Sequence, residues 1–173
     1  MSETNSRWTG MLKVLEIQHV RGGKVTWEDR TDNNLLHDGG EEYFLQCLFE
    51  NDGSLLPTSY YVGLDARSEL ANADTMDDLV DEPASNGYIR QTLGIDGGWS
   101  VTLVSGVYRA IGQILTFSAT GGDWGPVTKM FLTNESDDSG VLISSVPLSS
   151  TLTVEDGDSV NMRMSMSLRD YPL

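Results

Sequence analysis

Apolar and polar residues alternate without interruption over nine positions near the end of the chain, from Val160 to Leu168. Side chains of a β-strand point alternately to the two faces of its sheet, so this pattern predicts a strand with one buried and one wet face. Similar but less regular segments recur along most of the 173 residues. The chain is therefore expected to be an all-β protein.

The expected strands are short, and turns rich in glycine and aspartate separate them. Arg21-Gly22-Gly23 predicts a hairpin turn, because glycine readily adopts the positive φ that such turns need. The segments with strand character are residues 11–20, 24–30, 59–64, 88–93, 99–104, 107–119, 127–133, 141–144, 152–154 and 160–168. About eight to ten such strands are typical of two stacked antiparallel sheets, so we expect an antiparallel β-sandwich resembling a jelly roll. Within residues 107–119, apolar side chains occur at both odd-numbered and even-numbered positions, which point to opposite faces of a sheet. This pattern indicates burial on both faces.

One segment has helical spacing instead. Within residues 41–50, apolar side chains recur at Phe44, Leu45, Leu48 and Phe49. Two glutamates open the segment, where the helix dipole favours negative charge. We predict one short α-helix there, with these four side chains on its apolar, buried face.

The length of the chain fits one domain with a continuous core. Residues 1–10 are polar and are expected to form a mobile N-terminal arm, with Trp8 as its apolar anchor, while residues 11–173 form a single sandwich domain. The polar stretch from Asp65 to Asn86 is long for a connector inside a compact domain. Stretches of this length are usually functional or packing features.

The net charge is −15, with 26 acidic and 11 basic residues. This balance argues against binding to nucleic acid, since phosphate contacts depend on lysine and arginine. The acidity serves either solubility or a basic partner surface. The single cysteine permits no disulfide framework, and the sequence shows neither a membrane span nor a signal peptide. We therefore expect synthesis in a cytoplasm-like compartment and no membrane partner.

No catalytic motif accompanies the strands, so no enzymatic activity and no cofactor are expected. His19 and His37 are the only histidines, and each lies where a surface or capping residue is common. Acidic turns at residues 134–140 and 155–158 leave calcium binding open, with plain solvated turns as the alternative. Trp124, in a glycine-rich turn, could stack on a sugar ring, although core or interface packing is the more usual role.

Five segments in a fixed order resemble small structural proteins of tailed-bacteriophage virions. They are Asn34–Glu42 (NLLHDGGEE), Tyr60–Leu64 (YYVGL), Asp74–Met76 (DTM), Gly87–Gln91 (GYIRQ) and Leu115–Val127 (LTFSATGGDWGPV). Together they span most of residues 15–130. The resemblance brings no catalytic residues with it.

This resemblance implies a capsid decoration (cement) protein that binds the outer surface of the shell and stabilises it. The implied partners are the major capsid protein and further copies of the chain, most often in a homotrimer, within a virion made in the host cytoplasm. Trp8, Met76 and Leu79 are the expected apolar anchors on neighbouring subunits, with Trp124 as a further interface residue. The alternatives are a neck, tail or baseplate subunit, and a carbohydrate-binding module that recognises the host surface.

Overall fold

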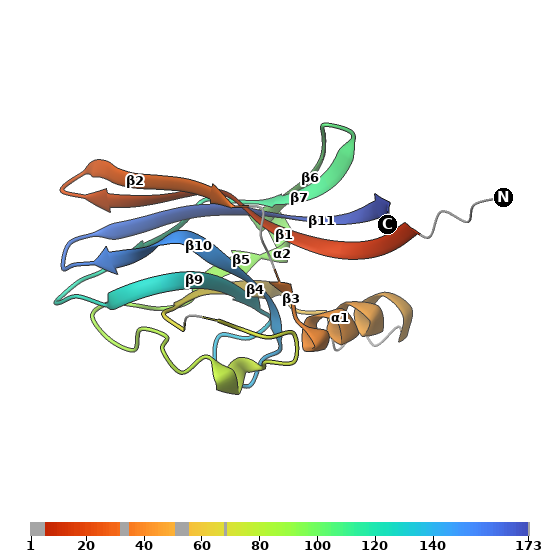
Figure 1. Ribbon diagram of the computed structural model, residues 1–173, viewed down its shortest axis with the longest axis horizontal. Coiled ribbons are helices and arrows are strands. Elements are labelled where there is room, and N and C mark those ends of the chain that lie inside the picture. Colours follow the sequence, from red (N-terminus) through yellow and green to blue (C-terminus); the bar gives the residue numbers. More distant parts are fainter. Residues whose placement is uncertain (1–5, 32–34, 51–55, 68, 173) are drawn as a thin grey trace.

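The computed structural model describes residues 6–31, 35–50, 56–67 and 69–172. Two antiparallel sheets lie face to face, and one helical segment lies at their edge (Figure 1). The predicted antiparallel β-sandwich with one short helix is confirmed.

One sheet has six strands in the order β2-β1-β11-β7-β6, and β8 pairs with the first part of β11. Its strands are β1 (Ser6–Arg21), β2 (Lys24–Thr31), β6 (Trp99–Val104), β7 (Val107–Gly112), β8 (Leu115–Ser118) and β11 (Ser159–Pro172). The first and last strands of the chain, β1 and β11, pair along nearly their whole length. The predicted hairpin between β1 and β2 is confirmed, with Gly22 and Gly23 both at positive φ.

The other sheet has five strands in the order β3-β10-β9-β4-β5. These are β3 (Leu35–Leu36), β4 (Ser59–Asp65), β5 (Gln91–Gly94), β9 (Gly125–Thr133) and β10 (Leu142–Val154). The helical elements are α1 (Asp38–Leu45), the π-helix η1 (Gln46–Glu50), the 3₁₀ turn η2 (Met76–Asp78) and α2 (Ile95–Gly98). Asp96 and Gly97 have non-helical backbone angles, so α2 is a tight turn between β5 and β6.

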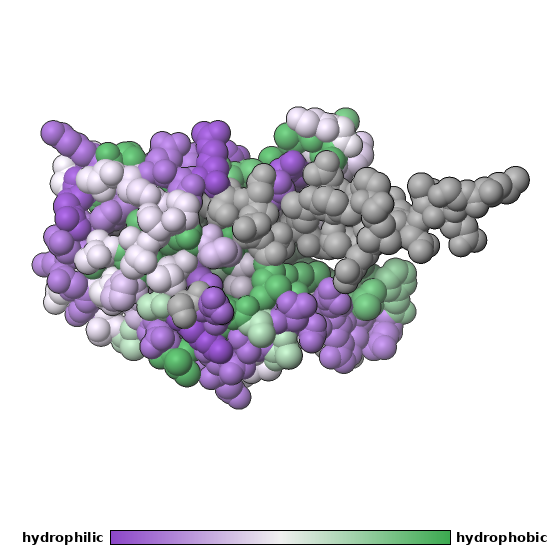
Figure 2. Space-filling model, viewed as in Figure 1, coloured by the Kyte–Doolittle hydropathy of each residue, from purple (hydrophilic) through white to green (hydrophobic). Residues whose placement is uncertain are grey.

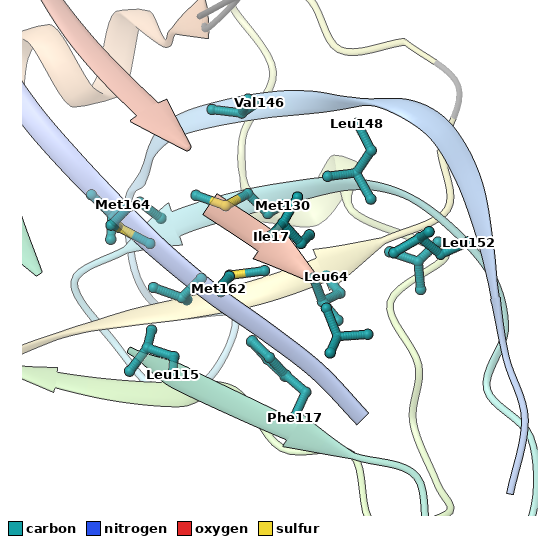
Figure 3. Packing of buried hydrophobic residues seen from close by; sticks show 14 of the residues in the cluster. Ile17, Leu64, Leu115, Phe117, Met130, Val146, Leu148, Leu152, Met162 and Met164 are labelled. Atoms are coloured by element: carbon teal, nitrogen blue, oxygen red, sulfur yellow. The ribbon is translucent and has the colours of Figure 1, made fainter. Parts of the chain in front are cut away.

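The core fills the space between the two sheets (Figure 3). Ile17, Met162 and Met164 project from β1 and β11, and each is at most 1% exposed. They face Leu64 and Met130 from β4 and β9 of the other sheet, both fully buried. β11 is the central strand of the six-stranded sheet, and its predicted wet face is confirmed at Arg163 but wrong at Ser165 and Ser167, which are buried.

Three boundaries differ from those expected. β1 begins at Ser6 rather than at the predicted Met11 and pairs with β11 from there, while residues 1–5 lie outside the described ranges and the mobile N-terminal arm stays a prediction. β10 runs continuously where two strands were predicted, with a register shift between Pro147 and Leu152. Residues 107–119 divide into β7 and β8, and the side chains of Tyr108 and Ile114 are exposed rather than buried.

Charge is divided unequally between the two layers. The strands of the six-stranded sheet hold eight of the eleven basic residues, namely Arg7, Lys13, Arg21, Lys24, Arg30, Arg109, Arg163 and Arg169. They hold only four of the 26 acidic ones, which are Glu16, Glu28, Asp29 and Asp170. Those of the remaining acids that fall within the described ranges lie in the helical segments, the loops, the turns and the other sheet.

We expect the buried Leu64 to contribute far more to stability than an exposed leucine. Leu64→Ala removes a fully buried side chain from β4 and should lower the free energy of unfolding by about 2–5 kcal/mol, because a cavity remains in the core. Leu56→Ala, at a side chain that is 59% exposed, should change it by less than about 0.5 kcal/mol. Urea unfolding followed by tryptophan fluorescence compares the two. Equal midpoints would contradict the assignment of the core.

Candidate interaction surface

The position of α1 is fixed by a buried histidine. His37 is fully buried directly before the helix, and its Nδ1 lies 3.0 Å from the carbonyl oxygen of Ala71. Its Nε2 lies 3.0 Å from the hydroxyl of Ser145 on β10. Burial lowers the pKa of His37 and favours the neutral ring, with Nδ1–H donating to Ala71 and Nε2 accepting from Ser145. His37 is the N-cap residue of α1, as one of the two predicted roles has it, although its side chain makes no capping hydrogen bond; the alternative prediction of a surface residue is wrong.

A glycine lets the start of α1 lie directly against β10. A β-carbon at Gly40 would overlap the carbonyl oxygen and carbon of Ile143, so only glycine fits this contact. Its neighbour Gly39 is exposed, and a β-carbon there would meet only the side chain of Val141, at 3.3 Å. The sequence Asp38-Gly39-Gly40 thus brings the helix onto the sheet at one defined point.

The second half of the helical segment turns its apolar side chains outward. After Leu45 the backbone continues as the π-helix η1, whose wider turn changes the angular spacing of the side chains. Leu45, Leu48 and Phe49 are 58%, 65% and 78% exposed, so the predicted burial of these three is wrong. Phe44 is half-buried and packs on the core, as does Cys47. The sequence Asn51-Asp52-Gly53, which predicts the end of this helix, lies outside the described ranges.

These exposed side chains stand among carboxylates. A groove along the segment is lined by Asp38, Glu41, Glu42, Leu45, Gln46, Phe49 and Glu50. We name Leu45, Leu48 and Phe49, with their rim of acids, the helix surface; Figure 2 shows hydrophobic and hydrophilic residues side by side there, below the grey atoms. No lysine or arginine occurs between Asp38 and Glu50. An apolar centre with an acidic rim suits a protein partner whose own rim is basic.

Two of the expected anchor residues are buried. Met76 and Leu79 are 3% and 8% exposed and form a second small core with Phe131 and Leu142. Met76 and Leu79 are therefore not exposed within the single chain, and their role as interface anchors stays a prediction. They fasten the loop after β4 onto the outer side of the five-stranded sheet.

The other two expected interface residues have different outcomes. Trp124 is half-buried, its Nε1–H donates to the carbonyl of Asn86 at 2.9 Å, and its ring meets Tyr88 edge to face. This tryptophan therefore packs against the end of the loop that follows β4. Trp8 lies in β1, paired with Asp170, and its side chain is outside the described part of the structure. Trp124 and the pair Met76 and Leu79 thus hold the same loop, at different points.

An ion-pair network ties this loop to the turn between β9 and β10. The Arg90 guanidinium donates to Glu82 at 2.5 Å and to Asp138, and it lies over the ring of Phe131 at 5.2 Å. The hydroxyl of Tyr88 donates to the same Glu82 carboxylate at 2.7 Å. The long polar stretch is thus a packing feature. Sequence reasoning missed Arg90, since two of its three partners, Phe131 and Asp138, are far away in the sequence.

A second network closes the end of the six-stranded sheet. Asp158 is 2% exposed and accepts from Arg21 Nη2 at 2.8 Å, from the backbone N–H of Glu155 at 2.9 Å, and lies 2.8 Å from Nε2 of His19. The hydroxyl of Thr26 lies 3.1 Å from the other ring nitrogen of His19. His19 is buried, so its prediction as a surface or capping residue is also wrong.

Thr26, His19 and Asp158 bring a hydroxyl, an imidazole and a carboxylate together in the order of the catalytic triad of serine hydrolases. Here, however, the carboxylate is bound by an arginine. Arg21 is the main cause that holds the pKa of Asp158 well below its usual range. The geometry supports a structural role, which is to fasten the β1–β2 hairpin to the turn between β10 and β11.

Five acids of the two turns considered for calcium have protein partners, namely Asp137, Asp138, Glu155, Asp156 and Asp158. Asp137 accepts from the backbone N–H and the hydroxyl of Ser139, and Asp158 binds the groups described above. Within the described ranges, no three His, Cys, Asp or Glu side chains converge as a metal-ligand set would. The same part of the chain contains no helix long and apolar enough to cross a bilayer.

Comparison with known proteins gives no assignment, because no protein-family model and no curated protein matches the chain.

We expect Asp158→Asn to remove a pH-dependent part of the stability. Because the folded-state pKa of Asp158 is depressed, its contribution is complete above the unfolded-state pKa of about 3.9 and declines as the pH falls below it. At pH 7 the variant should be less stable by about 2 kcal/mol, which is typical of hydrogen bonds to a charged group. Thermal unfolding between pH 7 and pH 3 measures both effects, with the exposed Asp77→Asn as the control. A constant difference from wild type across this range would contradict the assignment.

Gly40→Ala and Gly39→Ala form a matched pair that tests how α1 meets β10. The first should lower the free energy of unfolding by about 1–3 kcal/mol, because its methyl group meets backbone that cannot rotate away. The second should be neutral or raise it by up to about 1 kcal/mol, since alanine favours a helix over glycine. Denaturant titrations of both variants decide this, and equal effects would contradict the close contact.

Proposed function

We propose that this chain is a non-enzymatic structural protein of a tailed-bacteriophage virion, which decorates the outer capsid surface and stabilises the shell. Two things support the proposal: the ordered segments that resemble such proteins, and the helix surface. The observation that carries it is the exposure of Leu45, Leu48 and Phe49 at one end of the sandwich.

Three large apolar side chains on one short segment indicate a binding surface. Isolated exposed hydrophobic residues are normal on soluble proteins, whereas apolar groups gathered within a polar rim mark interaction sites. In the helix surface, Leu45 and Phe49 line a groove together with Glu41, Glu42 and Glu50. The fitting partner is a protein surface with an apolar centre and basic residues around it, and we assign this role to the major capsid protein.

The buried contacts around α1 suit such a task. His37 and Gly40 hold the start of the helix on β10, so the groove is already formed in the free protein. A preformed surface loses less conformational freedom on binding than a segment that must first become ordered. Many copies on one shell would then add their individual weak contacts.

We expect the double variant Leu48→Ser/Phe49→Ser to weaken binding to shells at least tenfold, because it removes the apolar centre of the helix surface. The matched control is Ile89→Ser, at a side chain that is 69% exposed but outside this surface. The measurement is co-sedimentation with empty shells of the phage that encodes the chain, prepared without this protein. The control should pellet like wild type.

Three results would count against the proposal. Wild type that stays in the supernatant would exclude decoration of the shell, and binding to purified necks, tails or baseplates in the same assay would assign the chain there. Wild type that binds host glycans instead would favour a carbohydrate-binding module. Shell binding by the double variant at wild-type strength would remove the helix surface from the account.

A further inference from the structure

The β6–β7 hairpin carries a stripe of apolar side chains of the kind found in the core, and none of the described residues forms a layer opposite it. It is a tight hairpin with positive φ at Ser105 and Gly106, and it projects away from the body of the sandwich (Figure 1). Val101, Leu103 and Tyr108 are 73%, 57% and 68% exposed. We name these three side chains the hairpin stripe.

The register shows why the stripe is apolar. Trp99, Val101 and Leu103 are alternate residues of β6, so their side chains lie on the same face of the sheet. Leu103 pairs with Tyr108 across the hairpin, which places Tyr108 on that face too. Trp99 packs against the core and meets Tyr60 edge to face. The hairpin stripe is therefore the continuation of the inner face of the sheet, beyond the place where the five-stranded sheet covers it.

β6 is also an unprotected sheet edge. Natural sheets protect their edges with charged residues, with proline, with bulges or by keeping the edge strands short. The edge strand β2 at the opposite side carries Lys24, Glu28, Asp29 and Arg30 and has register shifts against β1. Strands β3, β5 and β8 have only two, four and four residues.

β6 has none of these protections. Its six residues, Trp99–Val104, include no charged residue and no proline, and it pairs with β7 without a register shift. Its outer side has no strand partner among the described residues. Tryptophan, threonine and valine favour extended backbone, so this edge is well suited to accept another strand.

The charge pattern indicates which strand it accepts. Two copies, each with a net charge of −15, repel one another over most of their surface. No acidic residue occurs between Asp96 and Asp123, and Arg109 is the only charged residue there. The hairpin is thus the part of the molecule where two copies meet with the least repulsion.

The same comparison disfavours other sites for contact between copies. The helix surface is apolar too, but it would bring the rim acids Glu41, Glu42 and Glu50 of two copies together. An uncharged edge has no charge that would attract a strand of another protein. When a two-fold axis relates two copies, each apolar residue of one hairpin stripe meets apolar residues of the other copy's stripe. Isologous contacts of this kind are the commonest in soluble oligomers.

We propose that two copies of the chain associate edge to edge through β6, antiparallel about a two-fold axis, so that their six-stranded sheets become one. The hairpin stripes of the two copies then form one apolar face, and the free backbone groups of each β6 find partners. This inference does not depend on the proposed function. It differs from the trimer that the family resemblance implies. Antiparallel pairing of one β6 with another occupies both edges, so the assembly contains two copies.

The test is the mass of the purified protein in solution by light scattering, without shells. Wild type should have twice the chain mass of 19.0 kDa. Val101→Lys should have the single-chain mass, because a charge on β6 opposes edge pairing. Val25→Lys places the same substitution on the edge strand β2, where the side chain is 51% exposed, and should keep the double mass.

Hydrogen exchange gives a second measurement on the same proteins. Amides of β6 should exchange at least tenfold more slowly in concentrated than in dilute wild type, and equally fast at both concentrations in Val101→Lys. Far-UV circular dichroism checks that both variants keep their strands. A single-chain mass for wild type, a trimer, or a Val101→Lys variant that stays paired would each overturn the proposal.

Discussion

The antiparallel pairing of β1 with β11 is the contact on which the rest of the molecule depends. It joins the two ends of the chain and places Ile17, Met162 and Met164 on one face, where they meet the side chains of the five-stranded sheet. At one end of this pair, Arg21 and His19 bind Asp158 and fasten the turn before β11. Because partners so distant in sequence must meet, folding is expected to be slower than in proteins rich in local contacts.

A second constraint connects the helix to the long loop after β4. His37 binds Ala71 of that loop and Ser145 of β10 at once, while Met76 and Leu79 anchor the loop on Phe131 and Leu142. The Arg90 network holds its other end. The helix surface is therefore supported by side chains from three distant parts of the sequence, and a change in the loop would be felt at the helix.

The fold could be predicted from the sequence to the extent that its signals are local. The alternation around Met162 and Met164 and the glycine pair at Gly22 and Gly23 each correspond to the predicted strand or hairpin. Burial of Met76 and Leu79 could not be predicted, because an acidic stretch with two apolar residues has the composition of an exposed loop. These residues are buried only because the fold brings Phe131 into contact with them. The exposure of Leu48 and Phe49 was missed for another reason, since a 3.6-residue period was assumed where the backbone forms a π-helix. His19 and His37 owe their burial to partners more than a hundred residues away, Asp158 and Ser145.

The unequal division of charge between the layers has a consequence for how the molecule moves. Most of its cations belong to strands of the six-stranded sheet, whereas the loop after β4 and the helix, both on the side of the five-stranded sheet, carry acids (Figure 1). A body charged in this way has a permanent electric dipole as well as a net charge. Near a charged surface it experiences a torque in addition to attraction, and it turns before it touches. Within about 10 Å, the Debye length at 0.1 M salt, the molecule therefore presents one layer in preference to the other.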